Sequence, residues 1–120
     1  MSKRILIIDD EPHLVEVLAN RLRKAGYEIV SAVAGREGLE HASKAKPDLI
    51  LLDLLMPGLD GYHVLQELKQ RENTKSIPVM ILTVKKWSED IEKVMIQGAV
   101  DYIVKPFNPG ELLEKIKKVL

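Results

Sequence analysis

The chain has 120 residues, with 18 basic and 18 acidic side chains, 46% hydrophobic residues and no cysteine. This length predicts one domain over residues 1–120. The balanced charge gives no global attraction to nucleic acid or membranes, and the lack of cysteine excludes disulfides and thiolate chemistry. The apolar run near the start is too short for a signal peptide or a membrane span, so we expect a soluble, cytoplasmic domain.

Five short aliphatic runs of strand length recur along the chain. They are RILIID at 4–9, YEIVSAV at 27–33, DLILLD at 48–53, IPVMILT at 77–83 and VDYIVK at 100–105. The first, third and fourth runs are apolar throughout rather than alternating. That pattern is expected of central parallel strands covered by helices on both faces.

Each strand is followed by a segment with apolar residues at helical spacing. These residues are Leu14, Leu18, Leu22 and Ala25; Leu39, Ala42 and Ala45; Val64, Leu65 and Leu68; Ile91, Val94 and Met95; and Leu112, Leu113, Ile116, Val119 and Leu120. Gly26 and Gly98 are placed to end helices, Asp60 to cap one and Pro109 to begin one. The repeated alternation predicts an α/β fold, a doubly wound (βα)5 parallel sheet.

Polar residues stand where four of the predicted strands end. In open parallel sheets, ligands bind beyond the carboxyl ends of the strands. The first strand delivers Asp9 and Asp10, with Glu11 next, and the third delivers Asp53. The fourth delivers Thr83 and the fifth delivers Lys105. Each residue alone is unremarkable, since acids cap helices and most lysines are solvated, but the combination predicts a site.

The three predicted carboxylates imply a bound cation. Within about 4 Å of one another they would repel by roughly 4 kcal/mol per pair at a near-surface dielectric, and Lys105 can neutralise only one. Oxygen ligands without His or Cys favour Mg²⁺, which takes one or two carboxylates directly and keeps several waters. We therefore predict an acidic pocket that holds Mg²⁺.

Magnesium held by few protein ligands usually meets a phosphate, and phosphoryl transfer needs a nucleophile and hydrogen-bond donors. Asp53 is the best candidate nucleophile, because it ends the central strand before the turn MPGLDG and carboxylates form aspartyl phosphates. Thr83 and Lys105 can donate hydrogen bonds to phosphoryl oxygens. Phosphorylation would add charge and acceptor oxygens, so these donors would gain a new partner.

The segments ILIIDDEP, LILLDLLMPGLDG, ILT and YIVKPF occur in this order along the chain. Together they resemble the receiver domain of bacterial two-component response regulators, over essentially all 120 residues. The resemblance implies the flavodoxin-like fold of the chemotaxis regulator, with strand order 2-1-3-4-5. It implies a phosphoacceptor signalling switch rather than an enzyme, a domain that assists its own phosphotransfer and dephosphorylation.

The resemblance also implies residue roles. A histidine kinase or a histidine phosphotransfer protein would pass a phosphoryl group to Asp53 with Mg²⁺ bound. Asp10 and Asp53 would give carboxylate oxygens to the metal, Leu55 its backbone carbonyl, and Asp9 would act mainly through water. Thr83 and Lys105 would hold the phosphoryl oxygens.

The switch itself is implied in the same way. Thr83 would move toward the phosphate and Tyr102 would turn inward, which alters the surface formed by the fourth helix, the fifth strand and the fifth helix. That surface would control a partner or an output domain, in a monomer or a phosphorylation-dependent dimer. The Lys105-Pro106 peptide is expected to be cis, since proline makes that form cheap.

Three positions near the predicted site depart from the family pattern or vary within it. Val84 stands where the family usually has a small residue, and it could crowd the phosphoryl group or slow its transfer. Leu55 and Lys85 occupy variable positions associated with phosphate lifetime. Because an apolar Leu55 gives no help to an attacking water, we predict a long-lived phosphate on Asp53.

Two other functional classes use similar residues. A phosphatase of the haloacid dehalogenase type needs its nucleophile in a D-x-D-x-[TV] motif after the first strand, where this chain has DDEPH. A flavodoxin needs a Ser/Thr/Gly-rich phosphate loop at that point, and none follows. His13, His41 and His63 lack metal-ligand spacing and are expected on the surface. Trp87 is left open between a core residue and an exposed anchor for a partner.

Overall fold

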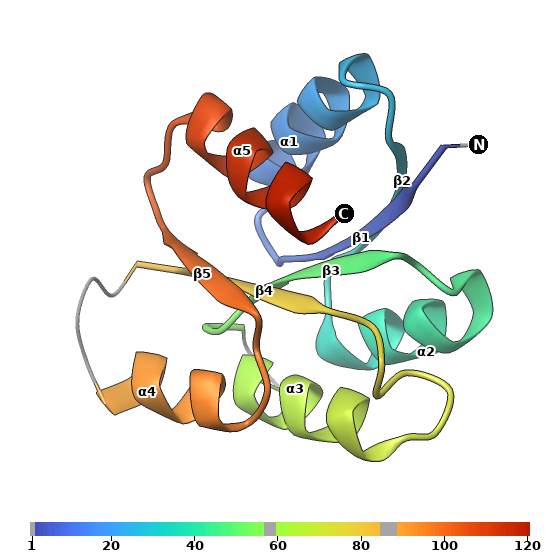
Figure 1. Cartoon of the computed structure of the whole chain (residues 1–120), viewed down its shortest axis with the longest axis vertical. Coiled ribbons are helices and arrows are strands. Elements are labelled where there is room, and N and C mark those ends of the chain that lie inside the picture. The colour runs from blue at the N-terminus through green and yellow to red at the C-terminus, as the bar shows by residue number, and fades with distance from the viewer. Residues whose placement is uncertain (1, 57–59, 85–88) are drawn as a thin grey trace.

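The computed structural model describes residues 2–56, 60–84 and 89–120, and strands and helices alternate along it (Figure 1). The strands are β1 (Arg4–Ile8), β2 (Glu28–Ala32), β3 (Leu49–Asp53), β4 (Val79–Thr83) and β5 (Asp101–Val104). The helices are α1 (Pro12–Lys24), α2 (Gly35–Ala45), α3 (Gly61–Gln70), α4 (Glu89–Ile96) and α5 (Pro109–Val119). The predicted alternation is confirmed. Lys85 and Trp87 lie outside the described residues.

The strands form one parallel sheet in the order β2-β1-β3-β4-β5. This is the predicted flavodoxin-like topology, and it places β3 at the centre. Every residue of β3 and β4 is buried, as is all of β1 after Arg4. The apolar runs therefore do belong to central strands covered on both faces.

Helices cover the two faces of the sheet in separate layers. Figure 1 shows α1 and α5 on one side and α2, α3 and α4 on the other. Because side chains alternate along a strand, each strand feeds both layers. In β1, Ile5 and Ile7 pack in the cluster with α1 and α5, and Leu6 and Ile8 pack in the cluster on the opposite face.

The predicted helix boundaries are largely confirmed. The Asp60 side chain accepts a hydrogen bond from the His63 N–H at 3.1 Å and caps α3. Pro109 is the first residue of α5. Gly26 and Gly98 follow α1 and α4 with φ of 99° and 112°, a conformation that favours glycine.

Three predicted strands are one residue too long at their carboxyl ends, and the second of these, predicted to end at Val33, ends at Ala32. β1 ends at Ile8 and β5 at Val104, so Asp9 and Lys105 follow their strands instead of ending them. The backbone ladder still fixes both residues. The Asp9 N–H donates to the Ala32 carbonyl at 3.1 Å, and the Lys105 N–H donates to the Thr83 carbonyl at 2.6 Å.

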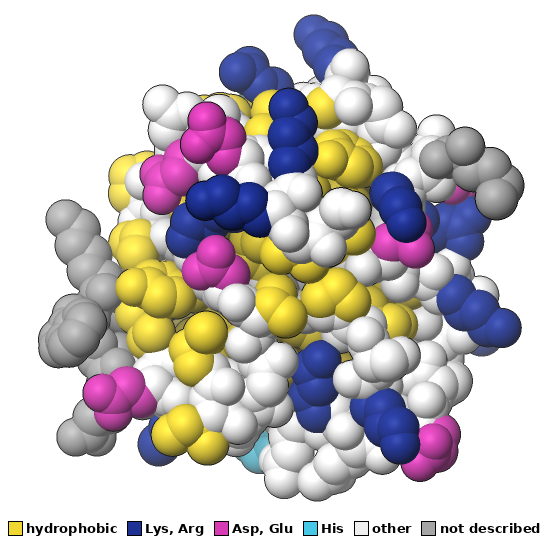
Figure 2. Space-filling model, in the orientation of Figure 1, with side chains coloured by type: hydrophobic (Ala, Val, Ile, Leu, Met, Phe, Trp, Pro, Cys, Tyr) yellow, Lys and Arg dark blue, Asp and Glu magenta, His cyan; other side chains and the backbone are white. Residues whose placement is uncertain are grey.

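Charged side chains of both signs are interspersed over the face of the molecule seen in Figure 2, as the balanced composition predicts. Hydrophobic side chains gather in the middle of this face, between α4 and α5. Exposed apolar residues near α4 and β5 include Ile96 and Val100, at 85% and 43% exposure.

Candidate functional site

The residues predicted to form a site meet at the carboxyl edge of the sheet. Asp53 ends β3, and Leu54 continues the ladder by donating its N–H to the Leu82 carbonyl at 3.3 Å. Asp9 follows β1, which pairs with β3, and Lys105 follows β5, which pairs with β4. Parallel pairing of the strands thus brings Asp9, Asp53 and Lys105 close together, although they are far apart in the sequence.

Asp9, Asp10 and Asp53 form one carboxylate cluster. One oxygen from each lies within 4.8 Å of the others. Asp9 is fully buried and Asp53 is 5% exposed, so neither is freely solvated. Two buried carboxylates this close are costly unless positive charge is nearby.

Lys105 provides that charge, in contact with more acids than the sequence predicts. Its Nζ lies 2.8 Å from Asp9 Oδ2, 3.1 Å from Glu11 Oε1 and 3.6 Å from Asp53 Oδ1. The part played by Glu11 was missed, although it directly follows the acid pair in sequence. Burial lowers the pKa of the Lys105 ammonium, but contacts with Asp9, Asp53 and Glu11 outweigh it, so the pKa is raised.

The chemistry of Asp53 is set by its surroundings. Burial raises the pKa of Asp53 to about 6, and the neighbouring charge of Asp9 adds to the effect. Lys105 and the Leu55 N–H, which donates to Asp53 Oδ1 at 3.4 Å, oppose it. Asp53 is therefore harder to ionise than an exposed acid, and its ionised form gains from any further cation nearby.

Gly61 allows α3 to begin very close to the end of β3. A methyl group added to it would lie 2.4 Å from the Asp53 carbonyl oxygen and 2.5 Å from the Leu54 Cα. The Gly61 N–H donates to the Leu54 carbonyl at 3.0 Å, which ties the start of α3 to the end of β3. Sequence reasoning missed this role. The signal was the Asp60-Gly61 pair at the start of the third helical segment, where glycine allows close approach of two backbones.

Leu55 and Val84, two of the positions singled out near the predicted site, both have exposed side chains, at 51% and 58%. Val84 lines a surface hollow of about 320 Å³ together with Glu11, Leu14, Lys105, Pro106 and Phe107. The Lys105-Pro106 peptide is cis, as the resemblance implied.

Thr83 and Tyr102, the predicted switch residues, lie on neighbouring strands. Thr83 ends β4 and is 1% exposed. Tyr102 is half-buried, opposite Ile81 in the ladder, and packs against the core under α2, α3 and α4. The Lys115 ammonium of α5 lies 5.2 Å from the centre of the Tyr102 ring and donates to the Tyr102 carbonyl.

The donor set of the cluster fits Mg²⁺. It consists of carboxylate oxygens, which hard cations prefer, and the three residues carry more negative charge than one lysine can offset. Asp10 is only partly buried, so the cluster opens to solvent on its side. That opening suits an ion that keeps several of its waters.

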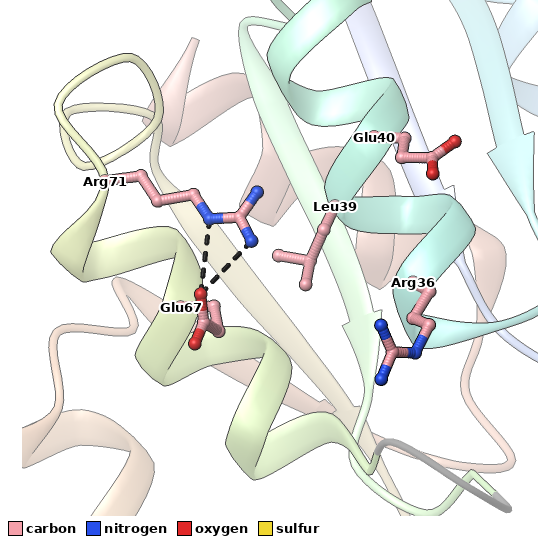
Figure 3. Close-up of a pocket in the computed structure, with 5 residues that line it drawn as sticks. All are labelled: Arg36, Leu39, Glu40, Glu67 and Arg71. Atoms are coloured by element: carbon pink, nitrogen blue, oxygen red, sulfur yellow. Dashed lines mark hydrogen bonds and ion pairs between the residues drawn. The ribbon is translucent and has the colours of Figure 1, made fainter.

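A separate hollow of about 270 Å³ lies between α2 and α3 (Figure 3). Arg36, Leu39 and Glu40 of α2 line it, with Glu67 and Arg71 facing them. Arg71 donates to Glu67 at 3.2 Å, so two of the charged residues that line the hollow are paired with each other. The hollow includes none of the three acids of the carboxylate cluster, and we assign it no part in their chemistry.

Comparison with known families agrees with this geometry. The response regulator receiver domain family matches residues 5–117. The chain belongs to this family. Receiver domains are phosphoacceptor signalling switches of two-component systems, and this receiver domain is a signalling domain, not a classical enzyme. The phosphatase and flavodoxin alternatives are thereby set aside.

Similar proteins include regulators and isolated receivers. The receiver domain is 40% identical to the alkaline phosphatase synthesis transcriptional regulatory protein PhoP of Bacillus subtilis, covering all of this chain but 49% of PhoP. Its structure superposes on chemotaxis protein CheY4 of Vibrio cholerae with a TM-score of 0.94, at 32% identity and full coverage of both chains.

A third relative bears on the metal. The receiver domain of sensor histidine kinase PA1611 from Pseudomonas aeruginosa has a magnesium ion coordinated in its active site cleft. It matches with a TM-score of 0.89 and 30% identity, over 98% of this chain and 97% of that one. Separately, none of the helices in the described residues has the length and apolar composition that crossing a bilayer requires.

Proposed function

We propose that Asp53 is the phosphoacceptor of this receiver domain. A carboxylate oxygen of Asp53 attacks the phosphorus of a phosphohistidine on a histidine kinase or a histidine phosphotransfer protein. The bond from phosphorus to the imidazole nitrogen breaks, and its electron pair stays with that nitrogen. The observation that carries the proposal is a nearly buried carboxylate at the end of the central strand, with an acid cluster and a lysine around it.

Asp10 and Asp53 would hold Mg²⁺ directly, Leu55 through its backbone carbonyl, and Asp9 mainly through water. The ion, when bound, supplies positive charge that offsets the acids and the incoming phosphoryl oxygens. Asp9 also has a second role, because its Oδ2 accepts from the Lys105 ammonium at 2.8 Å and keeps that ammonium at the site.

Thr83 and Lys105 would donate hydrogen bonds to the phosphoryl oxygens. Lys105 is already 3.6 Å from Asp53 Oδ1, and Thr83 ends the neighbouring strand. The same groups would assist the return reaction, in which water attacks phosphorus, the bond to Asp53 breaks and the carboxylate is restored. In this sense the domain assists its own phosphorylation and dephosphorylation.

The output of the switch would be the surface made by α4, β5 and α5. Thr83 would move toward the phosphate and the Tyr102 ring would turn inward, away from the Lys115 ammonium that lies 5.2 Å from its centre. The altered surface would control a partner protein or a joined output domain, as a monomer or a phosphorylation-dependent dimer. We propose that residues 1–120 act as one domain in the cytoplasm without direct contact to nucleic acid or membrane.

The site assignment is tested with a small phosphodonor. Acetyl phosphate with Mg²⁺ should add one phosphoryl group, read by intact mass, and Asp53→Asn should take up none. Asp60→Asn is a matched control, because Asp60 is a partly exposed acid that caps α3 and lies outside the acid cluster. Uptake by Asp53→Asn equal to that of the unmodified chain would show the assignment to be wrong.

The lifetime of the phosphate is tested on the same sample. The exposed aliphatic side chain of Leu55 offers no hydrogen bond to an attacking water, so we propose slow hydrolysis. Phosphoprotein freed of donor and kept with Mg²⁺ should lose its added mass slowly, and Leu55→Asn should lose it faster. Rapid loss from the unmodified chain would contradict this proposal.

A further inference from the structure

The Lys105 ammonium is shared among three carboxylates, and the phosphoacceptor is the most distant of them. The contacts to Asp9 and Glu11, at 2.8 and 3.1 Å, are hydrogen bonds. The contact to Asp53, at 3.6 Å, is a longer ion pair. An ammonium has three protons to donate, so two of them are directed to acids other than Asp53.

Glu11 is held where it can reach Lys105. It is the residue before α1, and its side chain caps no N–H of that helix. Its own N–H donates to Asp9 Oδ1 at 3.0 Å, which fixes its backbone beside the acid cluster. Its side chain is 62% exposed, whereas that of Lys105 is 10% exposed, so the pair joins an exposed carboxylate to a nearly buried ammonium.

We propose that Glu11 is a positioning residue that draws the Lys105 ammonium away from Asp53 and so weakens the hold of the site on phosphoryl oxygens. The proposal rests on the proposed function of Asp53. Phosphoryl oxygens on Asp53 are strong acceptors for Lys105, and the Glu11 carboxylate competes with them for the same donor. Glu11 is not in the acid cluster, so its charge can be removed while that cluster stays intact.

Glu11→Gln tests the proposal by binding. The probe is beryllium trifluoride, an anion that mimics a phosphoryl group on a carboxylate, titrated in Mg²⁺ and followed by the backbone amide NMR signal of Thr83. Because the Glu11–Lys105 pair is largely exposed on the Glu11 side, we expect the Kd to fall by about two- to fivefold. Glu16→Gln, which removes an exposed acid of α1, is the matched control and should leave the Kd unchanged.

A double-mutant cycle tests whether Glu11 acts through Lys105. In a Lys105→Met background, Glu11→Gln should no longer change the Kd. A second readout needs neither metal nor anion, since the titration of Lys105 can be followed by ¹³C NMR of its Cε. Glu11→Gln should lower the pKa of Lys105, because it removes a negative partner, and Glu16→Gln should not.

The outcomes distinguish a failure of the inference about Glu11 from a failure of the proposed function of Asp53. If the unmodified chain binds no beryllium trifluoride and takes up no phosphoryl group, the proposed function fails and the inference falls with it. If the unmodified chain does both, but Glu11→Gln binds the anion no more tightly, the inference alone is overturned. An equal gain in Glu16→Gln would also overturn it, because the effect would then be general charge.

Discussion

Lys105 and Lys69 are both partly buried, yet their surroundings shift their pKa values in opposite directions. Lys69, on α3, donates to the backbone carbonyls of Lys75 at 3.3 Å and Ile77 at 2.9 Å. Burial lowers the pKa of Lys69. Burial also acts to lower the pKa of Lys105, but the carboxylates around it raise the pKa overall.

The difference shows that Lys69 has a structural role, whereas Lys105 belongs to the acidic site. Two carbonyl oxygens accept hydrogen bonds from Lys69, and they carry no net charge, so these contacts leave no surplus negative charge for a cation to offset. Around Lys105 the carboxylates of Asp9, Glu11 and Asp53 exceed one positive charge. A metal ion would neutralise this surplus negative charge, so the site at the carboxyl end of β5 favours the binding of a cation.

The largest effect is expected from Lys105→Met. Removing a preorganised donor from phosphoryl transfer should slow uptake from acetyl phosphate by about 100-fold. Mg²⁺ should bind more tightly, since a competing positive charge is gone. Initial rates by mass and a Mg²⁺ titration measure the two changes, and a rate within about threefold of the unmodified chain would show that Lys105 is not the donor.

Asp53→Asn should stabilise the metal-free fold. An acid whose folded pKa of about 6 exceeds its ordinary value binds more protons folded than unfolded between these values, so stability falls as pH rises through that window. The variant should gain about 1–2 kcal/mol in the free energy of unfolding at pH 7.5, after allowance for solvent screening.

Urea denaturation at several pH values measures that gain. It should shrink as the pH falls through about 6 and vanish below the ordinary value of 3.8, where the carboxyl is protonated in both states. Saturating Mg²⁺ should also shrink it, by stabilising only the chain that retains the Asp53 carboxylate. A gain that is constant with pH would mean that the ionised carboxylate is not the cause.

Lys69→Met should show the opposite profile to Lys105→Met. Two carbonyls lose a charged donor, which should lower the free energy of unfolding by about 1 kcal/mol. Phosphoryl uptake and Mg²⁺ affinity should be unchanged, because Lys69 has no contact with the acid cluster in the described interactions. Slower uptake in this variant would erase the distinction between the two lysines.

The smallest effect that can be measured is the difference between the pKa values of Lys69 and Lys105. ¹³C NMR of lysine Cε signals should show Lys69 losing its proton at lower pH than Lys105. Stability contributed by Lys105 is lost as pH rises through its raised pKa, whereas deprotonation of Lys69 favours the folded state. Equal midpoints would mean that the two surroundings act alike.

Much of the fold and site follows from sequence pattern. Unbroken aliphatic runs predicted the covered strands, and helical spacing predicted the segments between them. Asp9, Asp53 and Lys105 were predicted together because parallel strands present their carboxyl ends at one edge. Asp60 was predicted as a helix cap and serves as one.

Other features needed the structure because they depend on side-chain reach. Glu11 shows no pattern that predicts its contact with Lys105, 94 positions away. The role of Gly61 depends on how closely α3 passes the Asp53 backbone, which spacing does not show. The ends of β1 and β5 were placed one residue late, since a polar residue after a strand can continue the ladder by a single bond.

The sequence by itself determined which groups this domain can use, since apolar period and strand-end chemistry are local properties of the chain. It determined a parallel α/β sheet with acids, a hydroxyl and an ammonium at one edge. Tertiary structure decided how they share charge. Hydrogen bonds and ion pairs depend on separations of a few tenths of an ångström, which is why the closer contacts of Lys105 with Asp9 and Glu11, rather than with Asp53, emerge only in the folded molecule.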